Sequence, residues 1–192
     1  RAVWNALRTE LNMGQYLDVV GTVGGRATMA TARTIMRHKT AGYTIVRPLQ
    51  LGAALAGRAE LADALAAHGL PLGTAFQLRD DVLGAFGDPE RTGKPVGDDL
   101  REGKPTVLLA LAIEAADDHQ RRVLERVGVT DDADDVSAIQ QVMVDTGALA
   151  ATEAEITTLF DEAVAAVDDL PDVNGSRAAL LALADYVVAR DV

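Results

Sequence analysis

The chain has 192 residues and no cysteine, and its formal net charge is −11 at pH 7. This length suits one domain with a single buried core, so we expect one domain over residues 1–192. The acidic balance argues against a nucleic-acid partner, because phosphate backbones attract lysine and arginine. Without cysteine the chain has no disulfide and no thiolate chemistry, and we expect a cytoplasmic location.

Hydrophobic residues make up 48 % of the chain, whereas aromatic residues make up only 4 %. Alanine, leucine and valine supply most apolar positions without sustained alternation, a pattern that favours helices over strands. No apolar run reaches the roughly 18 residues that a membrane span needs, and the first residues do not resemble a signal peptide. We therefore expect no stable membrane insertion.

The first part of the chain predicts three helices. Apolar residues at helical spacing predict the first over about residues 4–20, and the glycine pair at 24–25 should end it. A second helix is predicted over about 28–38. A third should run over about 39–56, with a kink at Pro48.

The remaining chain predicts a long helix, a polar loop and several shorter helices. The long helix should cover about 59–86, bent or interrupted near Gly69 and Pro71. Segment 87–104 has four glycines and two prolines among charged side chains, which predicts a solvated loop too polar for the core. Pro105 suits the first position of the next, nearly continuously apolar helix. Further helices are predicted near 118–127, 133–146, 149–170 and 176–190, and no segment predicts a strand.

The end of the long predicted helix carries the candidate chemistry. Gln77, Asp80, Asp81 and Gly84 follow one another at spacings that place an amide and at least one carboxylate on one face. Adjacent carboxylates in an apolar helix repel each other unless a cation compensates them. Mg²⁺ suits this place, because it is commonly shared between carboxylates and a substrate phosphate. The alternative is that both aspartates merely lie at a solvated helix end.

Lysine is scarce, since only Lys39, Lys94 and Lys104 occur among 18 basic residues. All three lie in polar clusters, where a compact ammonium group could bind a phosphate oxygen, although chance gives the same distribution. Thr40 and Tyr43 follow Lys39 within about one helical turn and add a hydroxyl and an aromatic ring. The alternative is that Thr40 caps a helix and Tyr43 packs in the core.

Asp131, Asp132 and Asp135 spell the pattern Asp-Asp-x-x-Asp. They stand where a helix is predicted to begin, and carboxylates at that position cap free amides and stabilise the helix dipole. We therefore predict a capping role for them and no metal site. The three histidines of the chain have no metal-ligand spacing.

Five motifs occur in order along the chain: MGQYLD at 13–18, KTAGY at 39–43, FQLRDD at 76–81, FGDPERTGKP at 86–95 and GDDLREGKPT at 97–106. In this order and at about these spacings they resemble the trans-prenyl diphosphate synthases, which include farnesyl and geranylgeranyl diphosphate synthases. The resemblance is dense from about residue 11 to residue 111, and the rest of the chain fits only as helices.

The resemblance implies an all-α orthogonal helical bundle of the isoprenoid synthase type. In such a bundle, aspartate-rich motifs on two helices bind Mg²⁺ and an allylic diphosphate. Ionisation of that diphosphate gives an allylic carbocation, isopentenyl diphosphate adds to it, and a proton is lost. Cations placed beforehand at the leaving group lower the barrier, because negative charge moves onto the diphosphate in the transition state. The resemblance also implies a homodimer.

The resemblance implies a role for each matching residue. The implied metal ligands and their acidic neighbours are Asp80, Asp81 and Asp99. The lysines implied to hold the diphosphate are Lys39, Lys94 and Lys104. The residues implied to place oxygen dipoles near the carbocation, beside Lys39, are Thr40 and Gln77.

Two departures from the family pattern bear on these roles. The second aspartate-rich motif usually reads Asp-Asp-x-x-Asp, whereas Gly84 stands here at the last position. Either the metal site is weaker for that reason, or Asp88 and Asp99 contribute from the following segment. The motifs also imply that the chain is a carboxy-terminal portion, that the helices with the first aspartate-rich motif are missing from it, and that it is inactive by itself.

Two alternatives to a catalytic role stay open from the sequence. A non-catalytic subunit that regulates an intact synthase would bind diphosphate without turnover. A helical interaction module would use its acidic pairs only for solvation. Metal-dependent binding of a diphosphate, and its dependence on Asp80, separates the last hypothesis from the others.

Overall fold

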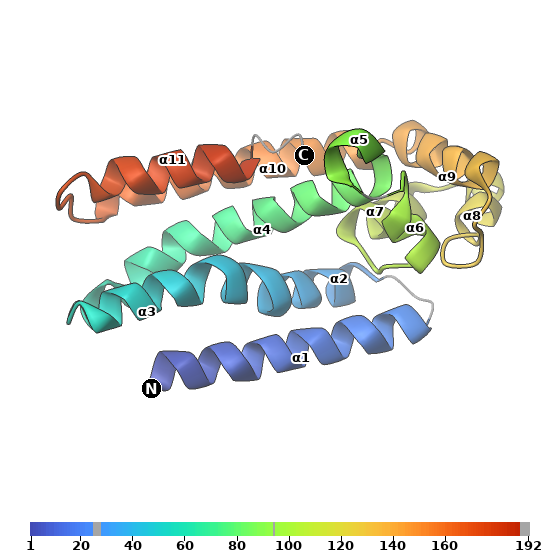
Figure 1. The fold of residues 1–192 in the computed structure, drawn as a ribbon. Coiled ribbons are helices and arrows are strands. Elements are labelled where there is room, and N and C mark those ends of the chain that lie inside the picture. Colours follow the sequence, from blue (N-terminus) through green and yellow to red (C-terminus); the bar gives the residue numbers. More distant parts are fainter. Residues whose placement is uncertain (25–27, 94, 189–192) are drawn as a thin grey trace. The chain divides into compact units, whose positions relative to one another are not determined.

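The computed structural model describes residues 1–24, 28–93 and 95–188, and every regular element in these ranges is helical (Figure 1). The chain begins with α1 (Ala2–Gly24), α2 (Met29–Ile35), the π-helix η1 (Met36–Val46), α3 (Arg47–Leu55), the 3₁₀ turn η2 (Ala59–Leu61) and α4 (Ala62–Phe86). It continues with α5 (Pro89–Thr92), α6 (Asp98–Glu102), α7 (Val107–Ala115), α8 (Asp118–Leu124), α9 (Ala133–Asp145), α10 (Ala148–Ala165), the 3₁₀ turn η3 (Ala166–Asp169) and α11 (Ser176–Val188). The all-α prediction is confirmed. Among the described residues, no helix combines the length and the apolar character that crossing a membrane requires.

The helices form two compact units. Unit 1 contains residues 1–16, residues 34–77 and the described residues from 155 onward, and unit 2 contains residues 17–33 and 78–154. Helices α1, α4 and α10 each contribute residues to both units. The candidate residues are divided between the units, with Lys39, Thr40 and Gln77 in unit 1 and the described acidic candidates and Lys104 in unit 2.

Unit 1 has an apolar core to which four helical elements contribute. Its fully packed members are Ile45 of η1, Leu72 of α4, Ala163 of α10, and Ala184 and Val187 of α11. His68 of α4 is also completely buried, and its Nδ1 lies 2.8 Å from the carbonyl oxygen of Ala163. This histidine therefore holds α4 to α10 within the core, in agreement with its lack of metal-ligand spacing.

Unit 2 is organised around α7, which is buried on most sides as its apolar run predicts. Thr106 caps this helix by accepting a hydrogen bond from the Leu109 N–H at 3.1 Å. Helix α7 packs against α9, and α9 packs against α8. Asp117 and Gln120 form a capping box at the start of α8, which satisfies two amides that the helix itself leaves free.

The predicted break between the second and third helices is wrong. Helices α2, η1 and α3 follow one another without interruption, since Ile35, Val46 and Arg47 all keep right-handed helical dihedrals. The wide turn of η1 ends where the Arg47 N–H donates to the Gly42 carbonyl, five residues earlier. Pro48 follows directly and has no N–H to lose, so the wide turn carries the helical path past it.

The long predicted helix is also continuous. Helix α4 runs through both Gly69 and Pro71, so the interruption that the sequence suggested is absent. An ideal Cβ on Gly69 would lie 3.1 Å from Val46 Cγ2, which shows that the glycine admits η1 close to α4. The glycine thus serves packing between helices and does not end its own helix.

The prediction of a wholly solvated loop over 87–104 is wrong. This segment contains α5 and α6, and Gly97, Asp99 and Leu100 within it are buried. Leu100 anchors α6 in unit 2 with only 3 % of its surface exposed. Pro105 is buried as well and precedes the cap residue, so α7 begins two residues later than predicted. The charge and polarity of the segment did not predict that one apolar side chain, Leu100, would be buried and order it.

Candidate functional site

The π-helix η1 holds Lys39 and Thr40 between glycines of two neighbouring helices. An ideal Cβ on Gly14 of α1 would lie 2.6 Å from the Lys39 backbone nitrogen. An ideal Cβ on Gly73 of α4 would lie 2.5 Å from Cα of Ala41. Only glycine allows such an approach, so both helices contact the backbone of η1 directly. These contacts and the wide turn fix the position of the Lys39–Thr40 pair within unit 1.

Thr40 and Gln77 are brought together, as expected for two residues of one site. Thr40 is 7 % exposed, and its hydroxyl donates a hydrogen bond to Oε1 of Gln77 on α4. Lys39 beside it is half-buried. Tyr43 is 45 % exposed, so it does not pack as a core residue in the described structure. The capping alternative for Thr40 is also wrong, because it lies inside a continuous helical path.

Glu10 and Arg47 form an ion pair in unit 1 that the sequence did not reveal. The guanidinium donates from Nε to Oε2 at 2.9 Å and from Nη2 to Oε1 at 2.5 Å. Its Nη1 donates to Oε1 of Gln50 at 2.7 Å. The hydrogen bond from Arg47 lowers the pKa of Glu10 below its ordinary value, against the opposing effect of burial. The pair joins α1 to α3, which are 37 residues apart in sequence at this contact.

The acidic end of α4 presents two different carboxylates. Asp80 is exposed, whereas Asp81 is only 6 % exposed. Gly84 follows them by four and three residues, so all three positions lie along one face of the helix. An accessible carboxylate next to a buried one is a donor set of hard oxygens that fits Mg²⁺. The metal-binding roles expected of Asp80 and Asp81 stay predictions.

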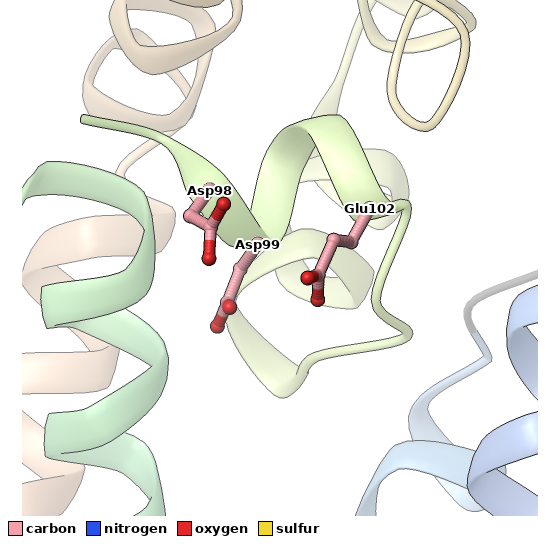
Figure 2. A group of neighbouring side chains, drawn as sticks. All are labelled: Asp98, Asp99 and Glu102. Carbon is pink, nitrogen blue, oxygen red and sulfur yellow. The ribbon is translucent and has the colours of Figure 1, made fainter. Parts of the chain in front are cut away.

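Helix α6 carries a second group of carboxylates in unit 2. Asp98, Asp99 and Glu102 offer ligand atoms within 4.8 Å of one another, and Figure 2 shows the Asp99 and Glu102 carboxylates on the same side of the helix. Lys104 already lies between them, with Nζ paired to Oδ1 of Asp99 and 3.1 Å from Oε2 of Glu102. The lysine ammonium thus pairs with two of the three carboxylates and offsets part of their mutual repulsion.

The surroundings of Lys104 favour its charged form. Burial by itself lowers its pKa, but the hydrogen bonds and charges of Asp99 and Glu102 outweigh burial and raise the pKa well above the ordinary value. Lys104 is therefore expected to be protonated in unit 2, and its binding of a diphosphate oxygen stays a prediction. Lys94, the other lysine predicted for this segment, lies outside the described residues.

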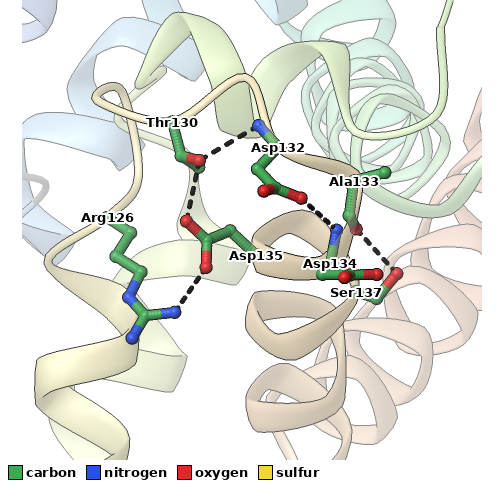
Figure 3. A network of polar contacts seen from close by, with 7 residues as sticks. All are labelled: Arg126, Thr130, Asp132, Ala133, Asp134, Asp135 and Ser137. Carbon is green, nitrogen blue, oxygen red and sulfur yellow. Dashed lines mark hydrogen bonds and ion pairs between the residues drawn. The ribbon is translucent and has the colours of Figure 1, made fainter.

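Within the pattern Asp-Asp-x-x-Asp, Asp132 has the predicted capping role at the start of α9 (Figure 3). Asp132 accepts a hydrogen bond from the Asp134 N–H at 2.8 Å. Asp135 pairs with Arg126 and accepts a hydrogen bond from the Thr130 hydroxyl at 2.8 Å. These carboxylates are engaged in local structure, as helix-start aspartates usually are.

Sequence reasoning missed the residues that position the candidates. Gly14 and Gly73 have no side chain and so allow the backbone of η1 to lie close to their helices. The burial of Asp99 depends on the position of α6, which the sequence did not predict. One signal was present in the sequence, because a glycine inside a helix costs about 1 kcal/mol relative to alanine and so suggests a packing reason. Applied to Gly14, Gly73 and Gly84, that rule would have pointed to all three close approaches.

Solved structures resemble the chain over nearly its whole length. A geranylgeranyl pyrophosphate synthase from Corynebacterium glutamicum, complexed with isoprenyl diphosphate and magnesium, is 42 % identical and superposes with a TM-score of 0.94. The match covers 99 % of this chain and 55 % of that one. A polyprenyl synthase from Caulobacter crescentus, complexed with calcium and isoprenyl diphosphate, is 32 % identical with a TM-score of 0.87, over 100 % of this chain and 58 % of that one. The predicted helical fold of the isoprenoid synthase type is confirmed.

Sequence comparisons agree with the structural ones. The geranylfarnesyl diphosphate synthase of Aeropyrum pernix is 33 % identical over 183 residues, which cover 94 % of this chain and 57 % of that protein. The chain thus spans little more than half the length of such relatives. The family model for polyprenyl synthetase matches residues 2–146, a range that contains every candidate residue. The chain therefore belongs to the polyprenyl synthetase family.

Proposed function

We propose that the protein containing this chain is a prenyltransferase that condenses an allylic diphosphate with isopentenyl diphosphate, with Mg²⁺ as cofactor. The observation that carries the proposal is the match over 99 % of the chain to a synthase whose crystal contains isoprenyl diphosphate and magnesium. On the basis of the same similarity we also propose products of the polyprenyl or geranylgeranyl type. A homodimer and a cytoplasmic location stay predictions, as does one domain over residues 1–192.

The charged candidate residues have two tasks. Asp80 and Asp81 would hold Mg²⁺, which when bound neutralises diphosphate charge, and Asp99 is the further acidic candidate. Lys39, Lys94 and Lys104 would bind the diphosphate that leaves with its bonding electrons. Charge moves from carbon to oxygen in this step, so ammonium groups fixed in advance stabilise the transition state.

Thr40 and Gln77 have a task on the carbon side. Their hydroxyl and amide oxygens are fixed by the hydrogen bond between them. Oxygen dipoles held in this way can stabilise a carbocation without reacting with it, because their orientation is set before the charge develops. Thr40 as a whole is 7 % exposed, so its side chain lies largely out of contact with bulk water.

Binding of a non-hydrolysable allylic diphosphate analogue tests the proposal. We expect calorimetry to show binding that requires Mg²⁺, and Asp80→Ala to weaken it by about tenfold or more. Asp131→Ala is the matched control, because Asp131 is an exposed aspartate of the capping segment and its loss should leave the affinity unchanged. Binding that is independent of Mg²⁺ and insensitive to Asp80 would favour the interaction module.

Turnover separates an enzyme from a regulatory subunit. Incubation with an allylic diphosphate and labelled isopentenyl diphosphate should yield an elongated diphosphate, and Lys39→Ala should slow its formation by about a hundredfold or more. Normal binding without any product would support the regulatory alternative.

A further inference from the structure

A cavity of about 140 Å³ lies in unit 1, among residues of α1, η1, α3 and α4. Its polar lining consists of Glu10, Arg37, His38, Arg47 and Gln50. None of the described candidate residues for the proposed reaction lines it, although Lys39 and Thr40 follow His38 directly in the sequence. Cavities that take drug-sized ligands usually measure about 300 Å³ or more, so this one suits a small ion or a single ionised group.

The lining of this cavity is positively charged, although the chain as a whole carries a formal charge of −11. Arg37 and Arg47 are both charged at every physiological pH, and Glu10 is the one carboxylate among the described lining residues. Two arginines against one carboxylate leave a net charge of about +1 before His38 is counted. The cavity therefore attracts an anion and repels a free metal ion.

Arg47 is held in the cavity wall by a chain of hydrogen bonds. Its Nε and Nη2 donate to the carboxylate of Glu10, and its Nη1 donates to Oε1 of Gln50. Gln50 is buried and donates in turn from Nε2 to the Ala62 carbonyl at 2.9 Å. A guanidinium has five N–H groups, so two of those on Arg47 are not used by these bonds. Because the group is already fixed in place, a ligand that binds it has less side-chain entropy to overcome.

Arg37 and His38 act on the same carboxylate from η1. The pKa of Glu10 is lowered chiefly by the hydrogen bond from Arg47, and the charges of His38 and Arg37 lower it further. Arg37 is exposed and His38 is half-buried. Within the described part of the chain, neither side chain forms a hydrogen bond or an ion pair. Their nitrogen donors are therefore available to a ligand in the cavity.

A phosphate group suits these donors better than a carboxylate does. The planar fork of Arg47 is already occupied by the carboxylate of Glu10, so a second carboxylate finds no free fork there. A tetrahedral phosphate accepts hydrogen bonds on several sides at once, and guanidinium groups bind its oxygens strongly. We propose that this cavity binds a phosphate group through Arg37, His38 and Arg47, with Glu10 and Gln50 holding Arg47 in position. The inference does not rest on the proposed function, because the cavity lies within unit 1 and needs no Mg²⁺.

Titration with inorganic phosphate, in the absence of Mg²⁺, tests the proposal by nuclear magnetic resonance of the histidine rings. The chain has three histidines, and of these only His38 lines the cavity, since His68 is completely buried in the core and His119 lies on α8 in unit 2. We expect the His38 signals to shift and to saturate at millimolar phosphate, while those of His68 and His119 stay in place. A His38 signal that does not shift, or that shifts without saturation together with His119, would overturn the inference.

Two substitutions in the lining should change phosphate affinity in opposite directions. Arg37→Gln removes a cation and should weaken binding about fivefold or more. Arg8→Gln is the matched control, because Arg8 is an exposed arginine of α1 in unit 1 that does not line the cavity, and its loss should leave the affinity nearly unchanged. Glu10→Gln keeps an oxygen that accepts from Arg47 but removes the negative charge, so it should tighten binding about threefold.

The sign of the Glu10→Gln effect separates binding from folding. Loss of the ion pair with Arg47 destabilises unit 1, so a merely structural effect of this variant would weaken phosphate binding. Weaker binding in Glu10→Gln, or equal weakening by Arg37→Gln and Arg8→Gln, would overturn the inference.

Lys104→Ala separates this cavity from the lysines proposed to bind the diphosphate. Phosphate affinity that depends on Arg37 and not on Lys104 would support the cavity in unit 1, whereas the reverse would place the ion at the diphosphate lysines and overturn the inference. Competition with glycerol phosphate then identifies the source of the phosphate group. Displacement of inorganic phosphate, with the same dependence on Arg37, would assign the cavity to phosphate esters, and a lack of displacement would assign it to the free ion.

Discussion

The charged pair of Glu10 and Arg47 makes the stability of unit 1 depend on pH. Glu10 and Arg47 join α1 to α3 through two hydrogen bonds, and the pKa of Glu10 is lowered chiefly by the hydrogen bond from Arg47. A carboxyl group with a lowered folded-state pKa stabilises the fold fully above its unfolded pKa of 4.5, and this stabilisation is lost as the pH falls through the folded-state value.

Glu10→Gln should therefore lower the free energy of unfolding by about 1 kcal/mol at neutral pH, as for a partly exposed charged pair. The difference from the wild type should disappear as the pH falls through the lowered folded-state pKa, because the carboxyl group is then protonated in both states. Urea denaturation at several pH values measures this. Glu60→Gln is the control, since its pair with Arg58 is exposed and should matter less. A difference that persists in strong acid would contradict the assignment.

At the scale of elements, close backbone approaches hold the candidate residues in place. The π-helix η1 is contacted by α1 at Gly14 and by α4 at Gly73. Similarly, Gly103 after α6 and Gly128 after α8 pack against each other, with an ideal Cβ on Gly128 only 3.0 Å from Cα of Gly103. The Gly128 N–H also donates to the Leu100 carbonyl at 2.8 Å. Each contact fixes a segment that bears a candidate lysine.

Gly14→Ala should destabilise the chain by about 1–3 kcal/mol, because its methyl group would have to displace the backbone of Lys39. Gly52→Ala is the matched control, and it should instead stabilise α3 by up to about 1 kcal/mol through helix propensity. Urea denaturation gives both values. Affinity for the diphosphate analogue should fall in Gly14→Ala only, and equal stability of the two variants would show that the approach at Gly14 is not required.

Gly128→Ala and Gly147→Ala form a second matched pair. Both glycines have a positive φ, 77° and 76°, so alanine pays a similar backbone cost of about 1 kcal/mol at each. Only Gly128 also has a close neighbour, whereas nothing lies within 4 Å of an ideal Cβ on Gly147. Gly128→Ala should therefore cost about 1 kcal/mol more in chemical denaturation. Equal costs would mean that the Gly103–Gly128 contact adds nothing.

At the scale of the whole molecule, α1 presents an apolar stripe to solvent. Met13, Tyr16 and Val20 occupy helix positions i, i+3 and i+7 and are 52, 67 and 48 % exposed. Gly14, on the opposite side of the helix, is buried against η1. We predict that this stripe takes part in the homodimer that the family resemblance implies.

We expect sedimentation velocity to show a dimer, and Tyr16→Glu to shift it toward monomer by placing a charge in the apolar stripe. Tyr186→Glu on α11 is the control, because Tyr186 is similarly exposed, at 71 %, and lies elsewhere in the chain. A chain that is monomeric at all accessible concentrations would contradict the dimer, as would a Tyr16→Glu variant that dimerises as the wild type does.

The sequence by itself determined the helical class, most helix boundaries and the family. Periodic apolar residues and local caps are short-range signals, which is why α9 and α11 begin at or next to the predicted residues and why Asp132 caps as expected. The same signals placed Gln77, Asp80 and Asp81 on one helix. They did not predict the continuous helical path through Lys39 or the short helices within 87–104. Both depend on contacts with residues that are distant in the sequence.

Only the tertiary structure decided which side chains and backbones meet. It joined Thr40 to Gln77 and Glu10 to Arg47, and it placed Asp99 over Gly84. The physical reason is that these contacts depend on how closely two helices approach, which is set by the volumes of residues far apart in the chain. A glycine in the sequence indicates that space is left beside the backbone. Only the folded structure shows which group occupies that space.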